Sequence, residues 1–153
     1  SPNLPNMKAV YLYPATCYFE ATPVSLGRGT SLPFQVYGHP NMTGYDYSFT
    51  PKSVPGAKNP PQLNKLCHGV NLSNMSDEEI WKRGVDLSYV IYAYKNLNIG
   101  DHFFRPFFEL LVGTDYVRKM IIEGKSEKKK KNRWKGDVEK FKEQRKPYLL
   151  YQE

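Results

Sequence analysis

The sequence lacks the features that mark several common classes of protein. Its 153 residues include only two cysteines and three histidines, with no CxxC or HxH spacing. This scarcity argues against a disulfide-rich scaffold and against a metal site. No apolar run approaches the length of a membrane span, so no transmembrane helix is expected, and no signal peptide is visible.

Two widespread catalytic motifs are also missing. No G-x-S-x-G sequence is present, so a nucleophilic serine on a strand-to-helix elbow is not indicated. The loop Gly27-Arg28-Gly29-Thr30 has neither the spacing nor the lysine of a phosphate-binding P-loop. No cofactor is expected from the remaining residues.

A carboxylate site is the chemical possibility that remains. Glu20 is an acid embedded among apolar residues, an environment that can tune a carboxyl group for acid–base work. Glycoside hydrolysis usually needs two carboxylates, and the nearest second candidate, Asp46, is expected to be exposed. Glu20 also precedes the loop that contains Arg28. This loop has two interpretations: a ligand-binding loop, or a turn in which Arg28 pairs with Glu20 for structural reasons.

The net charge of +7 is concentrated near the C-terminus. Between Arg118 and Lys146 there are 13 basic and 5 acidic residues. Such a segment can attract nucleic acid, an anionic membrane or a cell-wall polymer, although the solvated face of a surface helix is the ordinary explanation. The aromatic residues lie mostly earlier in the chain, which argues against nucleic-acid binding because stacking and basic side chains would not share a surface.

The predicted fold is α+β, with a mixed or antiparallel sheet from the first half and helices mainly from the second. The chain length suits one domain, residues 1–153. A capping-box pattern from Ser76 to Glu79 predicts a short helix through Trp81. The predicted strands are Lys8–Tyr13, Ala15–Glu20, Phe34–Gly38, residues 44–50 and Leu66–Leu72, the last bearing Cys67. Further helices are predicted over Asp86–Leu97, Asp115–Glu123 and Ser126–Arg145, followed by Tyr148–Tyr151 docking as a strand or extended segment.

The two cysteines, Cys17 and Cys67, both lie in strand-like apolar runs. One disulfide between neighbouring strands and two buried thiols are equally consistent with their spacing.

Several motifs together resemble the C-terminal part of the bacterial exo-β-N-acetylmuramidase family, once catalogued as a domain of unknown function. They are SPN-x-P, YP-x-x-C-x-x-E-x-T, S-x-GRGT-x-x-PF, LC-x-GV-x-L and F-x-x-x-R-x-PYLLY, and they extend from Ser1 to Tyr151. The resemblance implies a glycosidase that removes N-acetylmuramic acid from the non-reducing ends of peptidoglycan fragments. It also implies that a Rossmann-like N-terminal domain, absent here, forms the active-site cleft together with this domain.

The resemblance suggests which residues face that cleft. Glu20 is the candidate catalytic carboxylate, and the candidate substrate-binding residues are Thr22, Arg28, Gly29 and Thr30. The main acid and base are expected on the absent domain, so Glu20 would orient Arg28 or contact sugar hydroxyls. The chain departs from the family pattern at Leu26, where an acid is common. A periplasmic or exported location in a bacterium is implied.

Two other functions are compatible with the sequence. One is a non-catalytic module that binds glycan or a polyanion through the lysine-rich helix, and the other is a purely structural domain. If the chain belongs to a glycosidase, its expected partners are a peptidoglycan-derived sugar and the absent N-terminal domain. If it is a non-catalytic binding module, the expected partner is a glycan or an anionic polymer.

Overall fold

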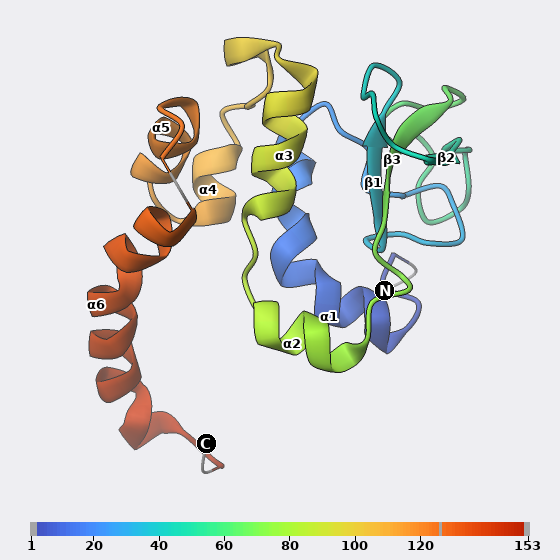
Figure 1. Ribbon diagram of the computed structural model, residues 1–153. Helices are drawn as coiled ribbons and strands as arrows, with labels where there is room; N and C mark the ends of the chain where they lie inside the picture. Colours follow the sequence, from blue (N-terminus) through green and yellow to red (C-terminus); the bar gives the residue numbers. More distant parts are fainter. Residues whose placement is uncertain (1–2, 126, 152–153) are drawn as a thin grey trace. The chain divides into compact units, whose positions relative to one another are not determined.

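Figure 1 shows the computed structural model of the chain, which describes residues 3–125 and 127–151, apart from the side chains of residues 127–133. The chain divides into two compact units, Ser1–Asp115 and Tyr116–Glu153. The first holds the sheet and four α-helices, so the α+β prediction is confirmed.

The chain begins with a helix, α1 (Met7–Thr16), where strands were predicted. The Asn6 side chain accepts a hydrogen bond of 2.9 Å from the backbone N–H of Ala9 and so caps the helix. The residues that it buries recur at helical spacing, and they are Ala9, Leu12, Ala15 and Thr16. The predicted strand over Lys8–Tyr13 is therefore wrong, because this buried stripe outweighs the local strand propensity of the aromatic and β-branched residues.

A 3₁₀ helix, η1 (Cys17–Ala21), continues directly from α1. The predicted strand over Ala15–Glu20 is therefore also wrong, and Glu20 lies in a helical turn rather than at a strand end. The backbone N–H of Thr22 closes the segment with a 3.0 Å bond to the Phe19 carbonyl. Phe19 is fully buried, which anchors η1 to the core.

The sheet has three antiparallel strands in the order β1-β3-β2. They are β1 (Val36–His39), β2 (Tyr47–Phe49) and β3 (Cys67–Asn71), and each overlaps a predicted strand. Val36 pairs with Asn71, and Phe49 pairs with Cys67.

Both faces of the sheet are covered. On one face, Val36, Phe49 and Cys67 pack together with Leu32 and Tyr47. Tyr37 points to the other face, as expected for a neighbour of Val36 on a strand. Its ring stacks on Phe19 at a centroid distance of 4.7 Å and meets Tyr89 at 5.8 Å. Tyr37 therefore joins the sheet to the helices that Figure 1 shows beside it.

Two helices follow the sheet, and both confirm the sequence predictions. In α2 (Asp77–Arg83), the Ser76 hydroxyl accepts a 3.1 Å bond from the Glu79 N–H, as the capping box predicts. In α3 (Ser88–Leu97), the buried face includes Val90 and Ile91. The next segments are η2 (Gly100–His102) and α4 (Phe108–Val112), a short helix that was not predicted.

Phenylalanines on both sides of Pro106 form an aromatic cluster. Phe104 lies 4.9 Å from Phe103 and 4.6 Å from Phe108, measured between ring centroids, and Tyr94 of α3 joins them. Phe107 is the exception, because its side chain is 49% exposed. This cluster binds the helices of the first unit to one another.

The second unit contains α5 (Tyr116–Ile122), α6 (Glu127–Arg145) and η3 (Lys146–Tyr148). Both predicted helices are confirmed, although Ser126 and the side chains of Lys128–Lys131 lie outside the described residues. Lys142 and Lys146 pair with acids of the same helical surface, which is typical of a solvated helix. The prediction that Tyr148–Tyr151 docks as a strand or extended segment is wrong, because Tyr148, Leu150 and Tyr151 are more than 80% exposed.

Candidate functional site

The loop that carries Arg28 is attached firmly to the sheet. Ser25 forms an isolated bridge with Gly38 of β1, with backbone hydrogen bonds of 2.8 and 2.9 Å in the two directions. On the other side of the loop, the Phe34 N–H donates to the Leu26 carbonyl at 2.8 Å. Arg28 is thus presented from a short, closed loop on a rigid scaffold, the arrangement in which loops commonly carry function.

Glycines on both sides of Arg28 shape this loop. Gly27 and Gly29 have φ angles of +78° and +83°, which side chains other than hydrogen rarely allow. A Cβ atom at Gly29 would overlap the Lys52 carbonyl oxygen, and the Lys52 N–H donates to the Gly29 carbonyl at 2.9 Å. The two glycines therefore let the chain turn tightly and pack against residue 52.

Arg28 and Glu20 form an ion pair. Arg28 Nη1 donates to Glu20 Oε1 at 3.4 Å, so the predicted pairing of these two residues is confirmed. The Arg28 side chain is 34% exposed and that of Glu20 is 26% exposed. Partial exposure and a long contact make this a weak bridge for stability. They also leave both groups accessible to a ligand.

The pair lies in a pocket of about 200 Å³ on the first unit. Half of the residues that line it are polar or charged, and the other half are apolar or aromatic. They are Asn3, Leu4, Tyr13, Glu20, Arg28 and Phe34. The pocket thus offers a cation and a carboxylate beside two aromatic rings, which suits a ligand with both an anionic and an apolar group.

The other predicted binding residues make hydrogen bonds within the loop and its surroundings. Thr22 is buried, and its hydroxyl donates to the Phe19 carbonyl at 2.9 Å. The Thr30 hydroxyl donates to the Gly27 carbonyl at 2.7 Å and accepts from the Leu32 N–H at 3.0 Å. Gly29 is buried and packs against residue 52. The structure therefore brings Glu20 and Arg28 together at the pocket, while Thr22, Gly29 and Thr30 support the loop.

Two aromatic residues of the pocket were not among the predicted site residues. The rings of Tyr13 and Phe34 lie 5.0 Å apart between centroids, at an interplanar angle of 52°. Phe34 has a φ angle of 61°, an outlier for a bulky side chain. No signal in the sequence marks such a backbone conformation at Phe34. Tyr13 could have been found, because residues seven positions apart on a helix share a face and Glu20 is seven residues after Tyr13, but a strand was predicted there instead.

The Glu20 carboxylate influences two neighbouring groups. Burial raises the pKa of the Cys17 thiol to about 11, and the charge of Glu20 adds to this effect. Burial and Glu20 also raise the pKa of the Tyr13 hydroxyl, while Arg28 opposes the change. Both groups therefore stay neutral at physiological pH. Cys17 and Cys67 are both free thiols.

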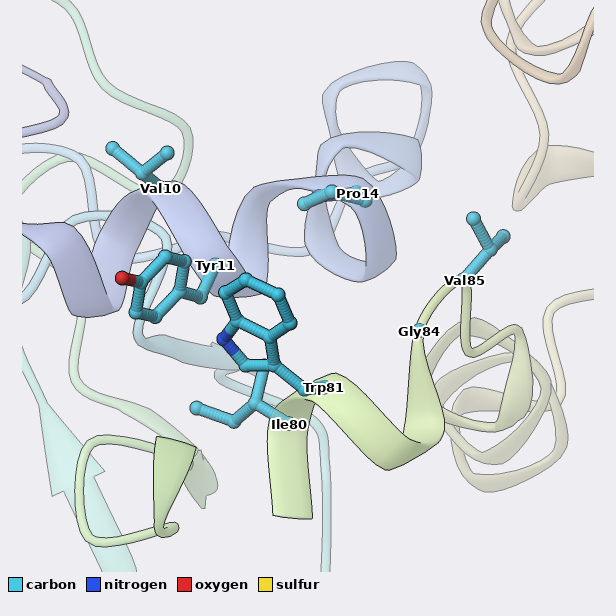
Figure 2. A pocket seen from close by; sticks show the side chains of 7 residues that line it. All are labelled: Val10, Tyr11, Pro14, Ile80, Trp81, Gly84 and Val85. Carbon is cyan, nitrogen blue, oxygen red and sulfur yellow. The ribbon is translucent and has the colours of Figure 1, made fainter. Parts of the chain in front are cut away.

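A second hollow, of about 350 Å³, lies between α1 and α2 (Figure 2). Trp81 is 68% exposed there, and its ring meets that of Tyr11 edge-on at a centroid distance of 5.3 Å. The described residues that line it carry no charge, and they are Val10, Tyr11, Pro14, Ile80, Trp81, Gly84 and Val85. An anionic ligand would therefore favour the pocket of Glu20 and Arg28.

Neither a cluster of potential metal ligands nor a membrane-spanning helix occurs among the described residues. Within residues 3–125 and 127–151, no three potential metal ligands from His, Cys, Asp or Glu gather at one place. Over the same ranges, each helix is too short or too polar to span a bilayer.

Comparisons with known proteins identify relatives that are all longer than this chain. The peptidoglycan beta-N-acetylmuramidase NamZ of Bacillus subtilis (strain 168) is 31% identical over 169 aligned positions, which cover 99% of this chain and 39% of the relative. A DUF1343 family protein from Bacteroides fragilis NCTC 9343, known from its crystal structure, is 80% identical with a TM-score of 0.98. That match covers 100% of this chain and 43% of the crystallised one.

A second DUF1343 family protein from Bacteroides fragilis NCTC 9343 shares the fold, with a TM-score of 0.61 at 19% identity, and the match covers 99% of this chain and 44% of that one. The chain thus spans less than half the length of each relative. The family described as exo-beta-N-acetylmuramidase NamZ, C-terminal, matches residues 11–151. The chain therefore belongs to the NamZ C-terminal family.

Proposed function

We propose that this chain forms one wall of the substrate cleft of a peptidoglycan glycosidase. The enzyme would release N-acetylmuramic acid from the non-reducing ends of glycan fragments, in a periplasmic or exported location of a bacterium. The Bacillus subtilis relative bears the name of a peptidoglycan beta-N-acetylmuramidase and is more than twice as long as this chain. In this proposal residues 1–153 are the C-terminal domain, and a Rossmann-like N-terminal domain supplies the rest of the cleft.

The accessible guanidinium of Arg28 carries the proposal. Arginine presents a planar fork of donors that matches a carboxylate, and Arg28 keeps 34% of its side chain exposed beside the pocket. Its contact with Glu20 involves Nη1 at 3.4 Å, which leaves room for a shorter, two-pronged bond with a ligand. N-Acetylmuramic acid carries a carboxylate on its lactyl group, and this is the group that Arg28 would bind.

Glu20 is a positioning residue in this proposal. Most glycosidases flank the scissile bond with two carboxylates, and Glu20 is the one acid among the described residues that line the pocket. Its contact with Arg28 holds the guanidinium at the rim, and its other oxygen would accept from a sugar hydroxyl. The catalytic acid and base would come from the N-terminal domain.

The proposal is tested by kinetics of the parent protein that contains this chain. Arg28→Ala should lower kcat/KM for a muramyl glycoside by about 10- to 100-fold, the range expected for a hydrogen bond to a charged group. Its free energy of unfolding should change by less than about 1 kcal/mol, because the Arg28–Glu20 pair is partly exposed. Lys58→Ala removes an exposed positive charge outside the pocket and serves as the control. Near wild-type kinetics for Arg28→Ala would contradict the proposal.

The same assay separates positioning from catalysis at Glu20. Glu20→Gln should raise KM several-fold and leave both limbs of the pH–rate profile in place, since an amide oxygen can still accept from Arg28. Loss of one limb, with a fall in kcat of about 10²- to 10⁴-fold, would instead identify Glu20 as the general acid or base.

A further inference from the structure

The pocket of Glu20 and Arg28 has an aromatic wall whose role the carboxylate contact does not explain. Tyr13 and Phe34 form this wall, with their ring centroids 5.0 Å apart. The volume of about 200 Å³ is smaller than the roughly 300–1,000 Å³ of sites that enclose a whole small molecule. The pocket therefore suits one substituent of a sugar rather than the entire ring.

The backbone at Phe34 is held in a strained conformation. Its φ angle of 61° is disfavoured for a side chain of this size. The surroundings enforce it: the Phe34 N–H donates to the Leu26 carbonyl at 2.8 Å, and the Thr16 hydroxyl donates to the Phe34 carbonyl at 3.3 Å. Residues kept in such conformations by several contacts cluster at ligand sites. Here the strain places the Phe34 ring against Tyr13, in the wall of the pocket.

Tyr13 supplies the accessible part of the wall. Its side chain is 37% exposed, whereas Phe34 is 3% exposed. Burial and the Glu20 carboxylate raise the pKa of the Tyr13 hydroxyl, although Arg28 opposes the change. The hydroxyl therefore stays neutral, and Tyr13 brings no negative charge to a site that would bind an anion. Its ring is available for contact with an apolar group.

We infer that Tyr13, whose ring is held in place by the buried Phe34, determines specificity by packing against the methyl group of the lactyl ether while Arg28 binds the carboxylate of the same group. This inference rests on the proposed function. The lactyl substituent bears a methyl group and a carboxylate on one carbon atom, so it matches a small pocket with a cation beside an aromatic wall. N-Acetylglucosamine lacks both groups, and its 3-O-carboxymethyl ether lacks only the methyl group.

The test compares two substrates in the parent protein: the aryl β-glycosides of N-acetylmuramic acid and of 3-O-carboxymethyl-N-acetylglucosamine. The wild type should prefer the muramyl substrate in kcat/KM by about tenfold, the usual effect of one methyl group in an apolar pocket. Tyr13→Ala should reduce this preference to less than about threefold, mainly by lowering activity on the muramyl substrate. Tyr13→Phe keeps the ring and should retain the preference. Phe34→Leu, which loses the ring but keeps an apolar side chain, should also weaken it.

The outcomes are separable. If the wild type hydrolyses the muramyl glycoside and Tyr13→Ala and Phe34→Leu keep the full methyl preference, the inference is overturned and the proposed function stands. If the wild type hydrolyses neither glycoside, the proposed function fails and the inference falls with it. If Tyr13→Ala loses activity equally on both substrates, the ring supports the pocket without recognising the methyl group, which also overturns the inference. Phe34→Leu decides the matter should Tyr13→Ala not fold.

Discussion

Gly29 offers the sharpest test of how the Arg28 loop is held. Its φ angle is +83°, and a Cβ atom there would overlap the carbonyl oxygen of Lys52 and approach Pro60 Cγ to 2.8 Å. Gly44 has nearly the same φ angle, +78°, but a Cβ atom added there would meet nothing within 4 Å. Replacing each glycine by alanine therefore separates the cost of the backbone conformation from the cost of the collision.

The expected magnitudes differ clearly. Gly44→Ala should cost about 1 kcal/mol, because the left-handed conformation costs roughly 1–2 kcal/mol for a side chain and the stiffer unfolded state returns part of that. Gly29→Ala adds an overlap with fixed backbone, typically about 1–3 kcal/mol. It also weakens the 2.9 Å hydrogen bond from Lys52 to Gly29, worth about 0.5–1.5 kcal/mol. The total for Gly29→Ala is roughly 3–5 kcal/mol.

Thermal and urea unfolding of the two variants, followed by near-ultraviolet circular dichroism, measures the difference. At about 2–4 °C per kcal/mol for a chain of this size, Gly29→Ala should melt roughly 6–20 °C below the wild type, and Gly44→Ala only about 2–4 °C below. Equal losses for the two variants would show that the loop does not pack tightly against residue 52. Arg28 would then be presented by a looser loop than the structure describes.

Two further predictions concern ionisation. Burial favours the neutral form of Asp86, but hydrogen bonds from Ser88 and Arg83 outweigh it and lower the pKa of this carboxyl. Asp86 therefore contributes stability above about pH 4 that is lost as the pH falls through its lowered pKa. Asp86→Asn should destabilise the protein by about 1–3 kcal/mol at neutral pH, and urea titrations should show this difference shrinking below about pH 4. A difference independent of pH would contradict that cause. Burial raises the pKa of the Cys17 thiol to about 11, so little of the reactive thiolate forms in the native protein. At mildly alkaline pH, Cys17 should therefore react with an aromatic disulfide roughly 100-fold more slowly in the native than in the unfolded protein. Equal rates in the two states would refute the burial of the thiol.

Local chemistry explains which parts of the fold could be predicted. The Ser76 hydroxyl and the Glu79 N–H are three residues apart, so the start of α2 follows from the sequence alone. The strand β3 could also be predicted, because the apolar and β-branched residues of Leu66–Leu72 favour a strand, and β3 forms over Cys67–Asn71. Such signals need no knowledge of the rest of the chain.

Contacts between distant residues explain what could not be predicted. Phe34 has a positive φ angle because Leu26 and Thr16 bind its backbone, and neither constraint is visible in a pattern of residue types. The tail from Tyr148 to Tyr151 has the composition of a buried strand but is largely exposed. The composition of a segment indicates which secondary structure it favours, whereas contacts with the rest of the protein determine whether it is buried.

The correction of strand to helix at the N-terminus also changes what the pocket can contain. On a strand, Tyr13 and Glu20 would point to opposite faces, because side chains alternate and the two residues are an odd number of positions apart. In the continuous turns of α1 and η1, seven residues complete about two turns and return to the same side. Both residues accordingly line one pocket. An ion pair between Glu20 and Arg28 is possible with either structure, but an aromatic wall beside that pair requires the helix. The proposed recognition of a methyl group and a carboxylate in one pocket thus depends on the helical segment of α1 and η1, which the sequence patterns predicted as strands.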